Sequence, residues 1–152
     1  MGQRQLKQDV LDDVFLRKLH KQMFSDTWTW AGTYRKSDKN IGCDWRQVSM
    51  RVRHLLENTK YQIEHNAMPP DELTARFHHQ LVLIHPFPNG NGRCCRLIAD
   101  LLLQKMGLEP FTWGSGGHAS LVSQSEMRAE YLAALRAADQ GDISPLLAFA
   151  RK

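Results

Sequence analysis

The stretch HPFPNGNGRCCR, residues 85–96, marks a forced bend in the chain, because it ends one helix and starts the next within a few residues. Pro86 and Pro88 stop a helix from continuing past His85, since proline lacks an amide proton and restricts the residue before it. The glycines of NGNG let the backbone turn sharply and come close to a ligand. We expect the next helix to begin near Asn91, with the unpaired amides of its first turn facing the bend. Such a helix start is an anion-binding site.

Charged side chains of the same stretch suit phosphate chemistry. Arg93 and Arg96 are three residues apart, so they share one face of the expected helix and offer two guanidinium forks to phosphate oxygens. His85 would stand at the rim of the bend, where a neutral imidazole can take a proton from an incoming hydroxyl. Phe87 is expected to point inward and anchor the loop. A histidine base, an amide cradle and two arginines together predict phosphate transfer from a nucleotide.

Helical periodicity extends on both sides of the bend. It predicts helices over 11–24, 50–64, 69–84, 91–107, 123–141 and 144–149. The apolar positions of the helix over 69–84 fall on one core face: Leu73, Phe77, Leu81 and Ile84. Asp12 or Asp13 is expected to cap the first helix, and Ser144 the last.

Residues 30–49 have no helical period. Gly32 and Gly42 stand toward their ends, Thr33 and Tyr34 favour strands, and a polar tip lies between them. This pattern predicts a two-stranded hairpin that can grip an extended peptide by strand addition. The predicted fold is therefore all-α, with one small β-hairpin.

Composition limits the class of protein. A chain of 152 residues is long enough for one domain with its own core. The longest apolar run, LIADLLL, is interrupted by Asp100, and the polar N-terminus lacks the pattern of a signal peptide. These two features predict no attachment to a membrane. Three cysteines do not form a disulfide framework, which indicates a reducing cytoplasm. A net charge of +4 without a long basic run does not favour nucleic acid as the partner.

The bend resembles the signature of the Fic family, H-P-F-x-(Asp or Glu)-G-N-G-R-x-x-R. Every fixed position except the acidic one is matched: His85, Pro86, Phe87, Gly90, Asn91, Gly92, Arg93 and Arg96. Residues 30–42, 75–87 and 131–150 also resemble the family's flap, its histidine-bearing helix and its closing helices. The resemblance implies a single Fic domain over 1–152, with a core of about 11–150. It is nearest to the mobile mystery protein B subgroup, which is found on mobile elements beside a helix-turn-helix partner and usually has a longer N-terminal extension.

Family membership would imply transfer of AMP from ATP to a Ser, Thr or Tyr hydroxyl of a target protein. His85 would be the general base. The phosphate-binding set would be Gly90, Asn91, Gly92, Arg93 and Arg96, with Asn91 near the α-phosphate and the arginines on the β- and γ-phosphates. The flap would clamp the target through Thr33, Tyr34, Arg35, Lys36, Asn40 and Ile41. Tyr131 and Leu135 share a helical face and would either line the adenine pocket or pack in the core. A kinase-type phosphotransferase and an inactive binding module with the same fold remain as alternatives.

Two departures from the family pattern affect this interpretation. Asn89 replaces the carboxylate that binds Mg²⁺ in the family, and a neutral amide is a poorer ligand for this hard cation unless it acts through a water. We expect weaker Mg²⁺ binding, with slower transfer or a shifted nucleotide preference. The chain also lacks the inhibitory pattern Ser/Thr-x-x-x-Glu-Gly/Asn. Restraint would then come from a separate inhibitory or helix-turn-helix protein, or from a longer N-terminus. An unrestrained enzyme would act as a toxin, as in a toxin–antitoxin pair.

Two adjacent pairs of reactive residues have simpler interpretations. His78 and His79 point in different directions on a helix, so one is expected in the core and one on the surface, rather than both on a metal. Cys94 and Cys95 follow the bend, where a helix start and two arginines would favour a thiolate, but we expect them to pack as small apolar side chains.

Overall fold

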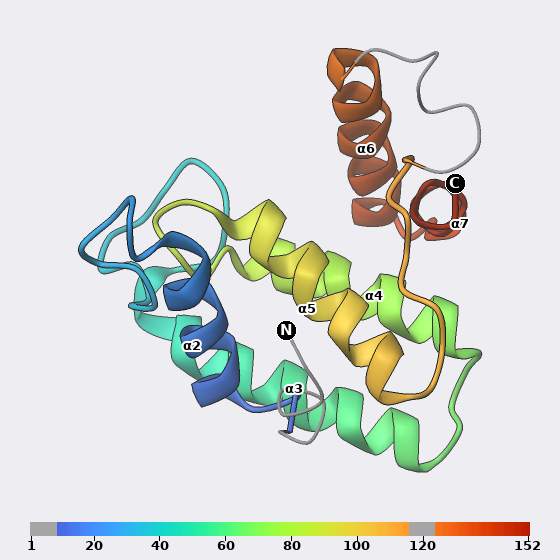
Figure 1. The fold of residues 1–152 in the computed structure, drawn as a ribbon, viewed down its shortest axis with the longest axis horizontal. Coiled ribbons are helices and arrows are strands. Elements are labelled where there is room, and N and C mark those ends of the chain that lie inside the picture. The colour runs from blue at the N-terminus through green and yellow to red at the C-terminus, as the bar shows by residue number, and fades with distance from the viewer. Residues whose placement is uncertain (1–8, 116–123) are drawn as a thin grey trace.

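The computed structural model describes residues 9–115 and 124–152, and within these ranges it consists of helices and connecting loops without any strand (Figure 1). The elements are α2 (Asp13–Phe24), the 3-10 helix η1 (Trp45–Gln47), α3 (Val48–Glu64), α4 (Pro70–Ile84), α5 (Asn91–Lys105), α6 (Gln124–Asp139) and α7 (Ser144–Ala150). The six α-helices of the described part correspond to the six that the sequence predicts. The predicted start of the helix over 123–141, Ser123, lies outside the described residues.

The main core lies around α4 and α5. α4 packs against α3, α5 and α7, while α5 also packs against α2, and α6 pairs with α7 at one end of the molecule (Figure 1). The predicted core face of α4 is confirmed, because all four of its apolar positions are buried: Leu73, Phe77, Leu81 and Ile84. None of the helices in the described ranges is long and apolar enough to cross a membrane.

The two predicted helix caps have different outcomes. The carboxylate of Asp12 accepts a hydrogen bond from the amide of Val14 at 2.9 Å, so Asp12 is the cap of α2. Ser144 is the first residue of α7 rather than its cap, and the carboxylate of Asp142 accepts from the Ser144 amide at 3.1 Å. The prediction of a serine cap was wrong because Asp142, two residues earlier, supplies the acceptor.

The predicted hairpin is absent from the described structure. Residues 25–44 form turns and bends, with local turn bonds from the Ala31 amide to the Trp28 carbonyl at 3.3 Å and from the Thr33 amide to the Trp30 carbonyl at 2.9 Å, and no strand pairing. The Arg35 amide donates to the carbonyl of Pro86 at 3.0 Å, and the Cys43 amide to that of Ile84 at 3.4 Å. Residues 30–43, which we call the flap segment, are therefore tied to the end of α4, and this attachment replaces strand pairing.

Two adjacent histidines tie α6 to α4. His78 Nε2 lies 2.7 Å from the hydroxyl of Tyr131, and His79 Nε2 lies 2.7 Å from a carboxylate oxygen of Asp139. Both histidines are buried, so the prediction that one of them faces solvent was wrong. The carboxylate of Asp139 explains the difference, because it gives the second ring a polar partner under cover of α6.

Candidate functional site

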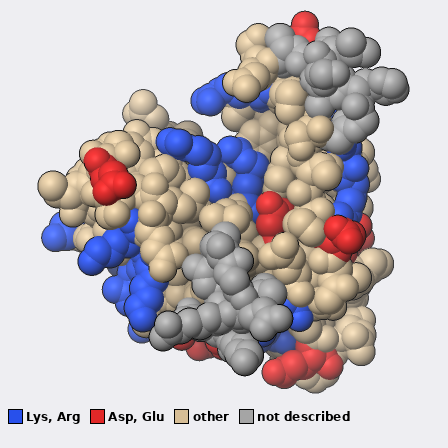
Figure 2. All heavy atoms as spheres, in the orientation of Figure 1, with Lys and Arg blue, Asp and Glu red and all other residues tan. Residues whose placement is uncertain are grey.

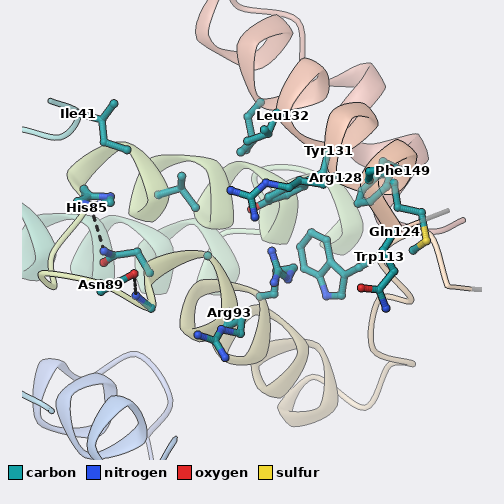
Figure 3. Close-up of a pocket in the computed structure, with 18 residues that line it drawn as sticks. Ile41, His85, Asn89, Arg93, Trp113, Gln124, Arg128, Tyr131, Leu132 and Phe149 are labelled. Atoms are coloured by element: carbon teal, nitrogen blue, oxygen red, sulfur yellow. Dashed lines mark hydrogen bonds between the residues drawn. The ribbon is translucent and has the colours of Figure 1, made fainter. Parts of the chain in front are cut away.

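A cavity of about 730 Å³ opens between the bend before α5 and the inner face of α6 (Figure 3). It contains the residues that the sequence assigns to the base, the metal position, the phosphates and the adenine, together with one flap residue: His85, Asn89, Gly90, Asn91, Gly92, Arg93, Arg96, Tyr131, Leu135 and Ile41. Segments up to about 90 residues apart in the chain therefore contribute to one volume.

The bend has the shape that its prolines and glycines predict. His85 ends α4 in the left-handed region (φ 54°), and Gly90 adopts the same region (φ 79°) before α5 starts at Asn91. A side chain at position 90 would meet the ring of Phe24 at 2.7 Å, so only glycine fits this approach. Phe87 is fully buried, as predicted.

The start of α5 presents unpaired amides to the cavity. The Cys94 amide makes the first α-helical bond, to the Gly90 carbonyl at 3.1 Å. The amides of Asn91, Gly92 and Arg93 precede it and have no acceptor within the helix. These three residues also line the cavity, so an anion placed there would meet both the amides and the positive end of the helix dipole.

His85 is half-buried at the edge of this cradle. The Asn91 amide group is fixed by two bonds to Phe87: its oxygen accepts from the Phe87 amide at 2.9 Å, and its nitrogen donates to the Phe87 carbonyl at 2.7 Å. The same nitrogen lies 3.3 Å from His85 Nε2, which must then be the acceptor and carry no proton. Burial, aided by the charges of Arg35 and Lys39, lowers the pKa of His85. The ring is therefore neutral near pH 7, with its lone pair at Nε2.

Three arginines reach the cavity from two elements. The guanidinium carbon of Arg93 lies 4.9 Å from the ring centre of Phe24, and that of Arg96 lies 5.2 Å from that of Tyr131. Aromatic rings of α2 and α6 thus hold the two guanidinium groups apart, so the predicted pair of neighbouring forks is spread, although both residues line the cavity. Arg128 lines the cavity from α6 (Figure 3). Our sequence reasoning missed Arg128, although its spacing from Tyr131 and Leu135 places all three on one helical face.

No carboxylate lines the cavity beside these cations, although Asp100, one turn further along α5, interacts electrostatically with Arg96. All 16 acidic residues of the chain lie in the described ranges, and none of them lines the cavity. Within the same ranges, Arg93, Arg96 and Arg128 form no ion pair with an Asp or Glu. Figure 2 shows basic atoms gathered where the surface is hollowed. The cavity therefore suits a ligand with several negative charges.

Asn89 is a poor direct ligand for magnesium. Its side-chain oxygen already accepts the Gly90 amide at 2.9 Å, and it is an uncharged ligand for a hard cation. No cluster of His, Cys, Asp and Glu suited to a metal occurs in the part of the chain that the structure describes. The residues present therefore do not fit a tightly held Mg²⁺.

His20 is a second residue that sequence reasoning missed. It is fully buried, its Nε2 donates to the Asn89 carbonyl at 3.0 Å, and its Nδ1 accepts from the Gly32 amide at 2.9 Å. Its ring stacks on Phe87 with 3.8 Å between ring centres. His20 therefore joins α2, the flap segment and the bend. The available signal was its position four residues after Leu16, on the apolar face of α2.

The six flap residues divide into two groups. Thr33, Lys36, Asn40 and Ile41 are exposed, and Ile41 also lines the cavity. Arg35 is only 2% exposed, and its guanidinium donates to the carbonyls of Ser37, Cys43, Ile84 and His85. Half-buried Tyr34 packs against Phe87 with 5.4 Å between ring centres. As folded here, Arg35 and Tyr34 attach the flap segment to the bend and to α4, and their contact with a target stays a prediction.

The adjacent cysteines belong to the core. Cys94 and Cys95 are both buried. Burial raises the pKa of Cys94 to about 12 and that of Cys95 well above its usual range. Neither is a thiolate at neutral pH, so the expected packing is confirmed.

Comparison with known proteins identifies one family. A family model described as Fic/DOC family matches residues 10–103. Protein adenylyltransferase fic-1 of Caenorhabditis briggsae is 38% identical over 86 residues, covering 57% of this chain and 15% of the relative. Protein adenylyltransferase Fic of Drosophila grimshawi is 34% identical over 126 residues, covering 78% of this chain and 23% of the relative. The chain thus spans less than a quarter of the length of these curated relatives.

Solved structures share the fold. A Fic domain containing signaling protein from Bacteroides thetaiotaomicron superposes with a TM-score of 0.75 at 21% identity, covering 96% of this chain and 62% of that one. Fic-1 from C. elegans (residues 134–508) gives 0.75 at 23% identity, with 98% and 44% covered. The N-terminal Fic domain of a Bartonella quintana effector with bound ADP gives 0.69 at 20% identity, with 93% and 72% covered.

Proposed function

The chain belongs to the Fic/DOC family, and from this membership we propose that it transfers AMP from ATP to a Ser, Thr or Tyr hydroxyl of a target protein. Relatives that are 34–38% identical are named protein adenylyltransferases. The observation that carries the proposal is that a neutral imidazole, a helix start with bare amides and two arginines line the same cavity. This arrangement can activate a hydroxyl and hold a nucleotide's phosphates within one volume.

In the proposed reaction, His85 Nε2 takes the proton of the target hydroxyl. The hydroxyl oxygen attacks the α-phosphorus of ATP and forms the new ester bond. The bond from this phosphorus to the oxygen that bridges it to the β-phosphate breaks, and pyrophosphate leaves with the electron pair. The amides of Asn91 and Gly92 would stabilise the charge on the α-phosphate oxygens, and Arg93 and Arg96 that on the leaving group. No step uses Mg²⁺, and a contact of Asn89 with the ion through water stays a prediction.

The proposal gives the two ends of the cavity different partners. Tyr131 and Leu135, on α6, would take the adenine; the Tyr131 ring is fixed by its hydroxyl bond to His78. The target segment would lie along the exposed part of the flap segment, beside Ile41, so that its hydroxyl reaches His85. Inhibition would come from a separate chain or from sequence outside this one. The three cysteines are free, which supports a reducing cytoplasm as the place of the reaction.

Labelled nucleotides test the proposal. The protein would be incubated with a cell lysate and ATP labelled at the α- or the γ-phosphorus, with His85→Ala as the control. Protein labelled only from α-labelled ATP supports AMP transfer. Label only from γ-labelled ATP indicates the kinase-type phosphotransferase of the same fold. Label from neither indicates a binding module, and label that persists in His85→Ala contradicts the assigned base.

A further inference from the structure

Three cationic side chains line the cavity in which the phosphates of a nucleotide would lie. Arg93 and Arg96 come from the start of α5, and Arg128 reaches over the cavity from α6, on the side away from Arg93 (Figure 3). Arg128 is exposed and, in the described residues, forms no ion pair with a carboxylate. Its guanidinium is therefore available to a ligand without first breaking a salt bridge.

The same space is unfavourable for a divalent cation. A Mg²⁺ ion there would share the cavity with three guanidinium groups and would find no carboxylate in the lining. The amide oxygen of Asn89, the residue at the expected metal position, already accepts the Gly90 amide. The cavity is favourable for polyphosphate without a metal ion. Guanidinium groups that form no salt bridge and the amides of a helix start both donate hydrogen bonds to phosphate oxygens.

We propose that Arg128 is a phosphate ligand, and that Arg93, Arg96 and Arg128 together bind the nucleotide's polyphosphate free of Mg²⁺. The identity of this ligand as ATP rests on the proposed function, whereas its polyanionic character rests on the charges of the cavity. Mg²⁺ then competes with the protein, since the ion occupies the same phosphate oxygens and adds positive charge to a cationic site. The arginines supply the charge compensation that the signature's carboxylate would otherwise supply through a metal.

Calorimetric titration tests the proposal without any turnover. The ligand is an ATP analogue with a methylene group between the α- and β-phosphorus, added either in EDTA or in excess Mg²⁺. We expect the intact chain to bind it at least as tightly in EDTA as in Mg²⁺. Arg128→Gln should weaken binding in EDTA by about tenfold, because a charged hydrogen-bonding partner is lost. Arg136→Gln is the matched control, since Arg136 is exposed on the same helix and does not line the cavity.

A second ligand separates this proposal from the proposed function. Inorganic tripolyphosphate has no adenine, so its binding in EDTA, and the weakening of that binding by Arg128→Gln, depend on the cations alone. Tripolyphosphate binding with this arginine dependence supports the inference even if no AMP transfer is ever detected. Mg²⁺ that tightens analogue binding to the intact chain tenfold would overturn it. Equal analogue affinity of Arg128→Gln and the intact chain in EDTA would also overturn it, and would leave AMP transfer unaffected.

Discussion

The bend at 85–96 and the flap segment at 30–43 lie against each other, yet they acquire their shapes in different ways. The bend is determined locally: prolines end α4, and a left-handed Gly90 starts α5. The flap segment is determined at a distance, since Arg35 donates to the carbonyl of His85, 50 residues away. The proposed catalytic histidine and the proposed target platform therefore share one set of hydrogen bonds. We therefore expect a substitution in the bend to reduce mainly the rate of AMP transfer, and a substitution in the flap segment to reduce mainly the free energy of unfolding.

The largest effect should come from removing the base while leaving the bend intact. Asparagine tolerates the left-handed backbone of position 85, so His85→Asn should preserve the turn and remove the imidazole. We expect AMP transfer to fall by about 10²- to 10⁴-fold, the usual contribution of a general base. Label transfer from α-labelled ATP measures it. Nucleotide affinity is the control and should change by less than about twofold, and unchanged transfer would show that the bend's chemistry does not depend on His85.

The next effect tests the link between the two regions. Arg35→Met keeps the length of the side chain but leaves several backbone carbonyls of the flap segment and of α4 without their donor. We expect the free energy of unfolding to fall by about 3 kcal/mol, because unsatisfied buried acceptors are costly. Urea unfolding measures this loss. Lys36→Met, at the exposed neighbouring position, should stay within about 0.5 kcal/mol. Equal stability of the two variants would mean that the flap segment is not held through Arg35.

A smaller effect concerns the metal. Asn89→Asp adds the single carboxylate that the cavity lacks and restores the family signature. We expect Mg²⁺ to become an activator of this variant, with Mg²⁺-dependent turnover about tenfold above that of the intact chain, since an anionic ligand suits the ion. Turnover at graded Mg²⁺ concentrations measures it. If turnover is the same in both proteins, Asn89 is not the reason for weak metal use.

The same contrast explains what the sequence could predict. The helices, the fold class and the residues around the cavity follow from local signals, because capping residues, prolines and a 3.6-residue period act within a few positions. The shape of the flap segment does not follow from local signals. Thr33 and Tyr34 favour a strand locally, but the segment bonds instead to the distant carbonyls of Ile84 and Pro86. His20 and Arg128 were missed for a related reason. Each carries no motif, and its role appears only when α2 or α6 is packed against the bend.

The smallest expected effect is a dependence of the free energy of unfolding on pH. It involves His20, which bonds to both the bend and the flap segment. Burial is the main cause that lowers the pKa of His20 and of His85 below the ordinary value of 6.5. The unfolded chain therefore binds these protons more readily than the folded protein does. It follows that the free energy of unfolding rises with pH. This stability is fully present above pH 6.5 and is lost as the pH falls through the lowered folded pKa values.

The contribution of His20 can be isolated, because its Nδ1 must stay unprotonated to accept the Gly32 amide. His20→Gln keeps one donor and one acceptor but does not titrate, so it should reduce the loss of stability between pH 7.5 and pH 5.5. A merely structural role would lower stability equally at both pH values. Urea unfolding at the two pH values measures the difference, and His54→Gln, at an exposed histidine of α3, is the matched control. If His20→Gln and the control lose the same free energy of unfolding between pH 7.5 and pH 5.5, then protonation of His20 does not weaken the bond between α2 and the flap segment.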